Sequence, residues 1–211
     1  MRKKLFGIAA VLGLVGASPA MAQIPIEIEP YVGVYIPFAD LIDQAIDNVD
    51  VIATQKEALV VGGRLGLGLG LVAIEGNFMY AFSDGERTNP ADGTVTQSAG
   101  IWAADARLLL KLLPGPISLH LSGGVALIGR SGEFYDNDEV TVDEGKTDLG
   151  GAVGAGLRVK LPGIFAIRGD ADLYLYSASV IANIEGVPGP VTTDSQLQAD
   201  LVLSAGLVFS L

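Results

Sequence analysis

The sequence predicts an all-β chain that closes into an up-and-down antiparallel barrel of eight transmembrane β-strands. Apolar and polar residues alternate with period two in eight segments, and these segments are joined alternately by long polar connections and by short turns. The bulky apolar residues share one face of each segment, whereas glycines and charged residues share the other. This division suits a lipid-facing exterior around a crowded lumen.

The first 22 residues have the three parts of a secretory signal. A basic start is followed by an apolar run too short to span a bilayer, and Ala20-Met21-Ala22 matches an A-x-A cleavage site. We therefore expect residues 1–22 to be a signal peptide that is removed on export. Residues 23–211 would then form one barrel domain in the cell outer membrane.

Charge and cysteine content exclude several function classes. Removal of the signal lowers the formal net charge from −11 to −14, because the signal carries three basic residues. So acidic a chain lacks the basic face that a nucleic-acid binder needs. The absence of cysteine excludes disulfides, thiolate metal sites and cysteine catalysis. No cofactor is expected.

The eight expected strands follow one another along the whole mature chain. They are residues 26–38, 59–69, 72–82, 100–112, 117–130, 149–161, 164–177 and 197–211. Pro30 and Pro37 fall in the first, and because proline lacks the ladder donor we expect them at a strand end or at a break in the ladder. The second and third would form a hairpin that turns at Leu69-Gly70 and sets Arg64 opposite or diagonal to Glu75.

The connections between the strands alternate strictly in length. Short turns are expected at Leu69-Gly70, Pro114-Gly115-Pro116 and Pro162-Gly163, because these sequences contain turn formers. Residues 39–57, 84–99, 131–148 and 180–196 would be long loops, the first with residues spaced for one or two helical turns. Long extracellular loops and tight periplasmic turns are typical of outer-membrane barrels. A propeller fold is disfavoured, since each repeat would hold only two strands.

The charged residues of the expected strands all lie on the polar face. Seven acids and seven bases occupy this face, and the loops hold the surplus of acids. A balanced set suits a plugged lumen, because a buried charge without a partner is costly. We expect a lumen ion-pair network made by Arg64, Glu75, Asp105, Arg107, Arg158, Arg168, Asp170, Asp172 and Asp200.

Large aromatic residues on the apolar face lie near the strand ends, where a barrel meets the two membrane interfaces. Those expected to form interfacial girdles are Phe38, Phe82, Trp102, Phe165 and Phe209. On these features the chain resembles the eight-stranded outer-membrane barrels of the OmpA and OmpX type. The resemblance rests on architecture and implies a fold rather than a function. Its implied partners are outer-membrane lipid, lipopolysaccharide and the barrel-assembly machinery, with a monomeric barrel and an unidentified external partner.

A lumen plugged by paired charges and the lack of a strong catalytic motif favour a non-enzymatic protein with a structural or surface-interaction role. An alternative is a lipid A-modifying enzyme that uses His120 and Ser122, a His-x-Ser pair on one face of a strand that resembles the pair of the PagL-type lipid A deacylases. A histidine that fills the lumen and contacts carboxylates is the simpler interpretation, so no catalytic residue is predicted. The acidic segments at 136–139 and 143–144 lack the spacing and glycine of a calcium loop, so no metal site is predicted. A lipocalin-like soluble carrier is a third hypothesis.

Overall fold

We describe the protein from a computed structural model. It describes residues 25–38, 42–46, 49–89, 93–113, 115–137, 140–142, 147–178, 180–182, 191–192 and 196–211. The expected signal peptide lies outside these residues. Within them, no helix has the length and apolarity needed to cross a membrane.

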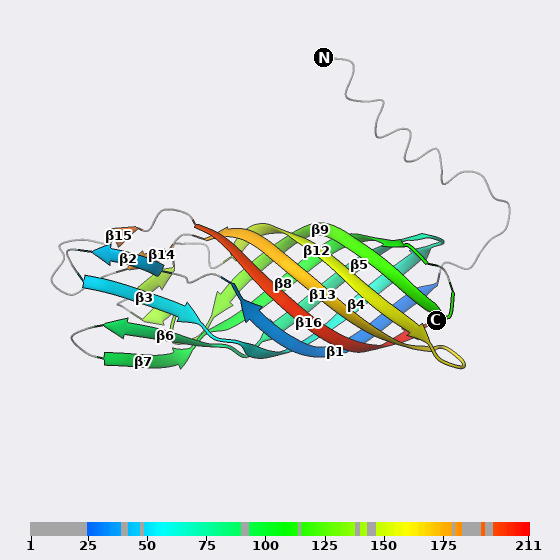
Figure 1. Ribbon diagram of the computed structural model, residues 1–211, viewed down its shortest axis with the longest axis horizontal. Coiled ribbons are helices and arrows are strands. Elements are labelled where there is room, and N and C mark those ends of the chain that lie inside the picture. Colours follow the sequence, from blue (N-terminus) through cyan, green and yellow to red (C-terminus); the bar gives the residue numbers. More distant parts are fainter. Residues whose placement is uncertain are drawn as a thin grey trace, which may run out of the picture.

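Eight long strands form a closed barrel, which confirms the predicted fold class (Figure 1). They are β1 (Ile26–Pro37), β4 (Ala58–Leu69), β5 (Val72–Ala81), β8 (Gly100–Lys111), β9 (Ile117–Ser131), β12 (Thr147–Lys160), β13 (Phe165–Ala178) and β16 (Gln196–Ser210). Every neighbouring pair is antiparallel, and β1 closes the barrel by pairing with β16. Each backbone ladder is therefore satisfied within the wall, as a hydrocarbon surrounding requires.

The two faces of the wall differ as the alternation predicts. Large apolar side chains such as Leu67 and Leu108 point outward and are 41% and 60% exposed, whereas charged side chains such as Arg64 and Asp172 point inward and are buried. A water-soluble barrel would have the opposite arrangement, because burial of apolar surface would then drive folding. The exterior is thus the lipid-facing surface of a transmembrane barrel.

The first hairpin differs from the prediction by one residue. Leu69 pairs with Val72, so the turn consists of Gly70 and Leu71, and Gly70 has a φ of 81° that glycine adopts without strain. The shift places Arg64 opposite Asn77 and leaves Glu75 as its diagonal neighbour. The alternation of apolar and polar residues was sufficient to predict the face on which each side chain lies. The position of the turn depends on the conformation of Gly70.

Both prolines of β1 lie where the ladder does not need their missing donor. Pro37 is the last residue of the strand. In the pairing of β1 with β16, the register runs from Ile28 opposite Phe209 to Tyr31 opposite Gly206, and Glu29 and Pro30 have no partners in that ladder. The break confirms the expectation for Pro30.

Strands replace much of the sequence predicted to be long loops, and that prediction is therefore wrong. One outer sheet has the order β2-β3-β6-β7 and the other the order β10-β11-β14-β15, and both lie beyond one end of the barrel (Figure 1). Their bounds are β2 (Ile42–Ile46), β3 (Val49–Gln55), β6 (Asp84–Asn89), β7 (Gly93–Ser98), β10 (Asp136–Asn137), β11 (Val140–Val142), β14 (Val180–Ala182) and β15 (Val191–Thr192).

The outer strands continue the barrel strands past the membrane. Two residues separate the end of β5 from the start of β6, and β6 pairs with both β3 and β7. Antiparallel neighbours leave the barrel side by side, so their backbone ladders extend beyond it without a further loss of loop-closure entropy. The stability of these ladders outweighs the tendency of the residues around Ile42 and Ile46 to form helical turns. The chain therefore carries two strand-built extensions at the end opposite to the C-terminus.

Candidate functional site: the filled lumen

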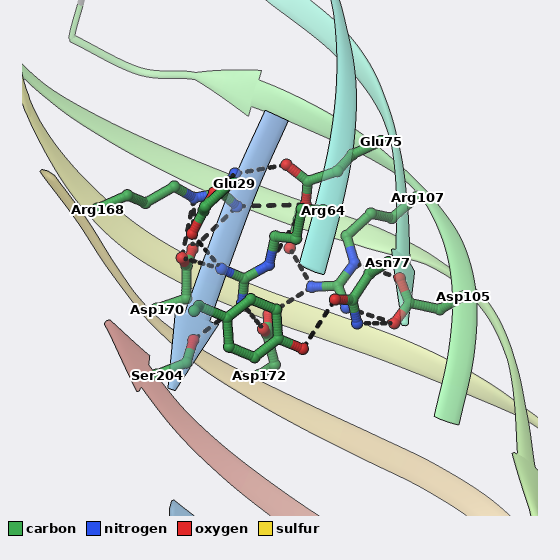
Figure 2. A network of polar contacts seen from close by, with 12 residues as sticks. Glu29, Arg64, Glu75, Asn77, Asp105, Arg107, Arg168, Asp170, Asp172 and Ser204 are labelled. Atoms are coloured by element: carbon green, nitrogen blue, oxygen red, sulfur yellow. Dashed lines mark hydrogen bonds and ion pairs between the residues drawn. The ribbon is translucent and has the colours of Figure 1, made fainter. Parts of the chain in front are cut away.

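The lumen has two differently filled parts. Near the outer sheets, a core of tyrosines and apolar side chains is fully buried, with Tyr35, Val60 and Ile101 all 0% exposed. On the side of this core away from the outer sheets lies a network of arginines and carboxylates, which are contributed by strands from opposite sides of the wall (Figure 2). Glycines and small residues on the inner face leave room for these long side chains.

Arg64 lies at the centre of this network. Its Nη1 donates to Glu29 at 2.6 Å and to Asp170 at 3.0 Å. Its Nη2 donates at 2.9 Å to both Asp172 and Ser204, and its guanidinium lies 4.2 Å above the ring of Tyr31. One side chain from β4 therefore contacts groups from β1, β13 and β16 (Figure 2).

Two further arginines complete the network. Arg107 donates from Nε to Oδ1 and from Nη2 to Oδ2 of Asp105, both at 2.7 Å, and also contacts Asp172. Arg168 pairs with Glu75, with Glu29 at 3.2 Å and with Asp170 at 2.9 Å. Bidentate and charge-assisted bonds of this kind are the strong ones, and the low-dielectric surroundings strengthen them further.

Asparagine and tyrosine join the ion pairs to the aromatic core. Asn77 accepts from the hydroxyl of Tyr31 at 2.8 Å and donates to Asp105 at 2.7 Å. Tyr174 donates to the same carboxylate at 2.9 Å. The charged and aromatic parts of the lumen thus form one continuous packed structure.

The nine predicted network residues do not all meet. The structure brings together Arg64, Glu75, Asp105, Arg107, Arg168, Asp170 and Asp172. Arg158 instead pairs with Glu27 at 2.7 Å near the end of the barrel that holds the short turns. Asp200 lies toward the outer sheets and accepts from the hydroxyl of Tyr176 at 2.6 Å.

Glu29 belongs to the network as well, although the sequence did not predict it there. Glu29 bridges Arg64 and Arg168, and its side chain occupies space beside Gly206 that a Cβ would fill. This contact between a glycine in β16 and a glutamate in β1 forms only when the barrel closes. The buried tyrosines were not predicted as core residues either, because charged residues dominate the pattern of the polar face.

The outer mouth of the lumen is covered by the turn that follows β9. Phe134 and Tyr135 are 3% and 2% exposed, and the backbone N–H of Phe134 donates to the carbonyl of Ser98 at 3.0 Å. The ring of Phe134 occupies the space in which a side chain at Gly85 would lie. Burial raises the pKa of the Tyr135 hydroxyl above its ordinary value, so that it stays neutral.

His120 and Ser122, the predicted alternative pair, contact different partners. His120 lies 2.7 Å from Asp170 through Nε2, and Ser122 accepts from Arg107 at 3.4 Å. Among the described residues, no hydrogen bond joins His120 to Ser122. The acidic segments at 136–139 and 143–144 lie largely outside the described residues, and within those residues no group of three His, Cys, Asp or Glu side chains is arranged to hold a metal ion.

The predicted girdle aromatics all lie on the outer surface of the barrel. Phe38 and Phe82 are about as exposed as the leucines around them, and Trp102 is half-buried against Phe78. Phe165 pairs with Phe209 across β13 and β16, and their rings form an edge contact with centroids 5.4 Å apart. Their role as interfacial anchors remains a prediction.

A closed barrel with an apolar exterior, a filled lumen and short turns at one end defines the class of protein. It is an eight-stranded β-barrel of the outer-membrane type. Compared by sequence, the chain matches no protein-family model and no curated protein.

Solved structures of outer-membrane barrels share the fold. The outer membrane protein OprG from Pseudomonas aeruginosa matches with a TM-score of 0.69 at 11% identity, over 89% of this chain and 96% of that one. AlkL, solved in lipid bilayers, matches with a TM-score of 0.57 at 18% identity, over 92% and 94% of the two chains. The Neisserial surface protein A matches with a TM-score of 0.55 at 9% identity, over 88% and 96%.

Proposed function

We propose that this chain is a non-enzymatic outer-membrane protein. Its membrane-spanning part is a closed scaffold that conducts no ions, and the strands beyond the barrel make its contacts with the outside. The observation that supports the proposal is the continuous filling of the lumen, in which Arg64, Arg107 and Arg168 are all under 5% exposed. An eight-stranded barrel has room for little more than its own side chains.

The proposal also includes export and assembly. Residues 1–22 would direct secretion, the barrel-assembly machinery would insert residues 23–211 as a monomer, and lipopolysaccharide would surround the outer half of the barrel. The segments beyond the barrel are rich in acids by sequence. Direct attraction to lipopolysaccharide phosphates is therefore unfavourable, and divalent cations would have to bridge the two.

Planar-bilayer recording tests the closed lumen. The purified full chain, refolded and shown to be folded by heat-resistant gel migration, should produce no large steady conductance at neutral pH. The physical reason is that the buried ion pairs around Arg64 would leave no continuous water path across the lumen. A steady conductance from folded protein would contradict the proposal.

A lipid assay tests the non-enzymatic part. Cells that express the wild-type chain or His120→Ala should have the same lipid A mass profile, because His120 contacts Asp170 rather than Ser122. Heat-resistant migration of both proteins is the control for folding. A lipid A species that appears with the wild type and is lost in His120→Ala would instead support the enzyme.

A further inference from the structure

A small cavity remains inside the lumen, toward the end of the barrel that holds the short turns. Its volume is about 20 Å³, which is room for about one water molecule. Its lining includes Lys111, Ser118 and Arg158, which come from the three neighbouring strands β8, β9 and β12. The proposed function gives this cavity no role.

The register of the three strands places these polar side chains beside one another. Lys111 lies opposite His120 in the pairing of β8 with β9, and Ser118 lies opposite Arg158 in the pairing of β9 with β12. Ser118 and His120 are two positions apart on β9, so they share the inner face of the wall. Lys111 and Arg158 therefore lie on the two sides of β9, and Ser118 lies between them.

Each of the three side chains has a polar group that no other described residue satisfies. Arg158 donates from Nη1 to Glu27 and from Nη2 to Ser210 at 3.1 Å, but its Nε is buried and has no partner. Within the described part of the chain, the ammonium of Lys111 makes no ion pair and the hydroxyl of Ser118 makes no hydrogen bond. Ser118 and Arg158 are only 6% and 8% exposed. Buried donors without partners are costly, so this cluster favours a bound acceptor.

The acids that line the cavity are already held by arginines. Both carboxylate oxygens of Glu27 lie 2.7 Å from Nη1 of Arg158. Glu75 pairs with Arg168. Lys111 is half-buried, and among the described residues it is the cation of this lining that has no acid beside it. A water molecule could accept hydrogen bonds here, but only an anion would also offset the charge of the ammonium.

We propose that this cavity binds one monatomic anion of the size of chloride. The ammonium of Lys111, the hydroxyl of Ser118 and the Nε–H of Arg158 would all donate to it. Chloride is only slightly larger than a water molecule, so it suits the volume, whereas a phosphate or carboxylate group has too many atoms. This inference goes beyond the proposed function and does not depend on it. The bound ion would link β8, β9 and β12 inside the lumen.

Unfolding in urea tests the site, because a ligand that binds only the folded state raises its stability. The purified full chain, refolded in zwitterionic detergent micelles and freed of chloride by dialysis, is unfolded in sodium chloride and in sodium gluconate of equal ionic strength. Gluconate is too large for the cavity. The urea midpoint of the wild type should be higher in chloride and should rise with chloride concentration. Equal midpoints in the two salts would overturn the proposal.

Two lysine variants separate the cavity from general effects of salt. Lys111→Met should lose the shift between chloride and gluconate. Lys160→Met removes an exposed lysine at the same end of the barrel that does not line the cavity, so it should keep the shift. An equal loss in both variants would show that overall charge is responsible and would overturn the site. If Lys111→Met does not fold, Ser118→Ala takes its place and should reduce the shift.

Two further salts test the size of the ligand. Bromide should give the same difference in urea midpoint between the wild type and Lys111→Met as chloride does. Phosphate should give no such difference, since the comparison with the variant cancels its general effect on stability. A difference of equal size in phosphate would show that the cavity admits oxyanions, and the assignment to a monatomic ion would be wrong.

Discussion

Arg64 donates from Nη1 to Oδ2 of Asp170 at 3.0 Å, although 106 positions separate the two residues in the sequence. Their strands are not neighbours in the wall, because β1 and β16 lie between β4 and β13 on the shorter path around the barrel. The contact therefore crosses the lumen and joins two parts of the wall that share no ladder. Such contacts make the filling of the lumen part of the fold.

Removal of the central arginine should destabilise the barrel strongly. Arg64→Met leaves Glu29, Asp170 and Asp172 without one of their donors. Breaking a buried pair by removing one partner costs about 3–5 kcal/mol, and we expect a loss of this size in the free energy of unfolding in urea. The measurement is tryptophan fluorescence of the refolded barrel, using Trp102.

The matched control is an exposed ion pair of the same chain. Lys56 and Glu86 lie 2.5 Å apart, and their side chains are 43% and 34% exposed. Lys56→Met should therefore change the unfolding free energy by less than about 1 kcal/mol. Equal effects of the two substitutions would show that the lumen pairs are as well solvated as those at the surface.

Gly156 on β12 should tolerate no side chain. A Cβ at this position would overlap the carboxylate of Asp170 and the ring of His120. Gly156→Ala should cost about 1–3 kcal/mol, because both groups are buried and their partners fix them in place. Gly76 has no atom within 4 Å of its would-be Cβ, so Gly76→Ala should be nearly neutral, and this contrast is measured in the same urea titration.

The cost of placing a charge on the outer face should depend on how deep that position lies in the membrane. Val125 lies near the middle of β9 and is 63% exposed, and Leu149 lies near the outer end of β12 and is 73% exposed. Arginine at the bilayer midplane costs about 2–4 kcal/mol but only about 0–1 kcal/mol near an interface. Val125→Arg should therefore destabilise the barrel in lipid vesicles, whereas Leu149→Arg should not.

The same pair of variants tests the alternative of a soluble carrier. If this barrel stayed in water, the exposed Val125 and Leu149 would both face solvent, and both arginines would be tolerated. Partition of the wild type into the soluble fraction, together with unchanged stability of Val125→Arg, would contradict a transmembrane barrel.

The sequence by itself determined the number of barrel strands and the face to which each side chain belongs. The period of two is a local property of the extended backbone, so Leu67 and Arg64 could be assigned to opposite faces without knowledge of any neighbour. Lipid then decides which face lies outside, because only apolar side chains are stable there. The fold class followed from these two facts.

Only the tertiary structure decided register, partners and the extent of the strands. A shift of two residues in one hairpin keeps every side chain on its face, so alternation could not show that Arg64 lies opposite Asn77. The association of Glu29 with Arg168, and of His120 with Asp170, arises from closure of the barrel across the lumen. The outer strands form because neighbouring strands leave the membrane side by side. The sequence of a single connection does not show which other connection lies beside it.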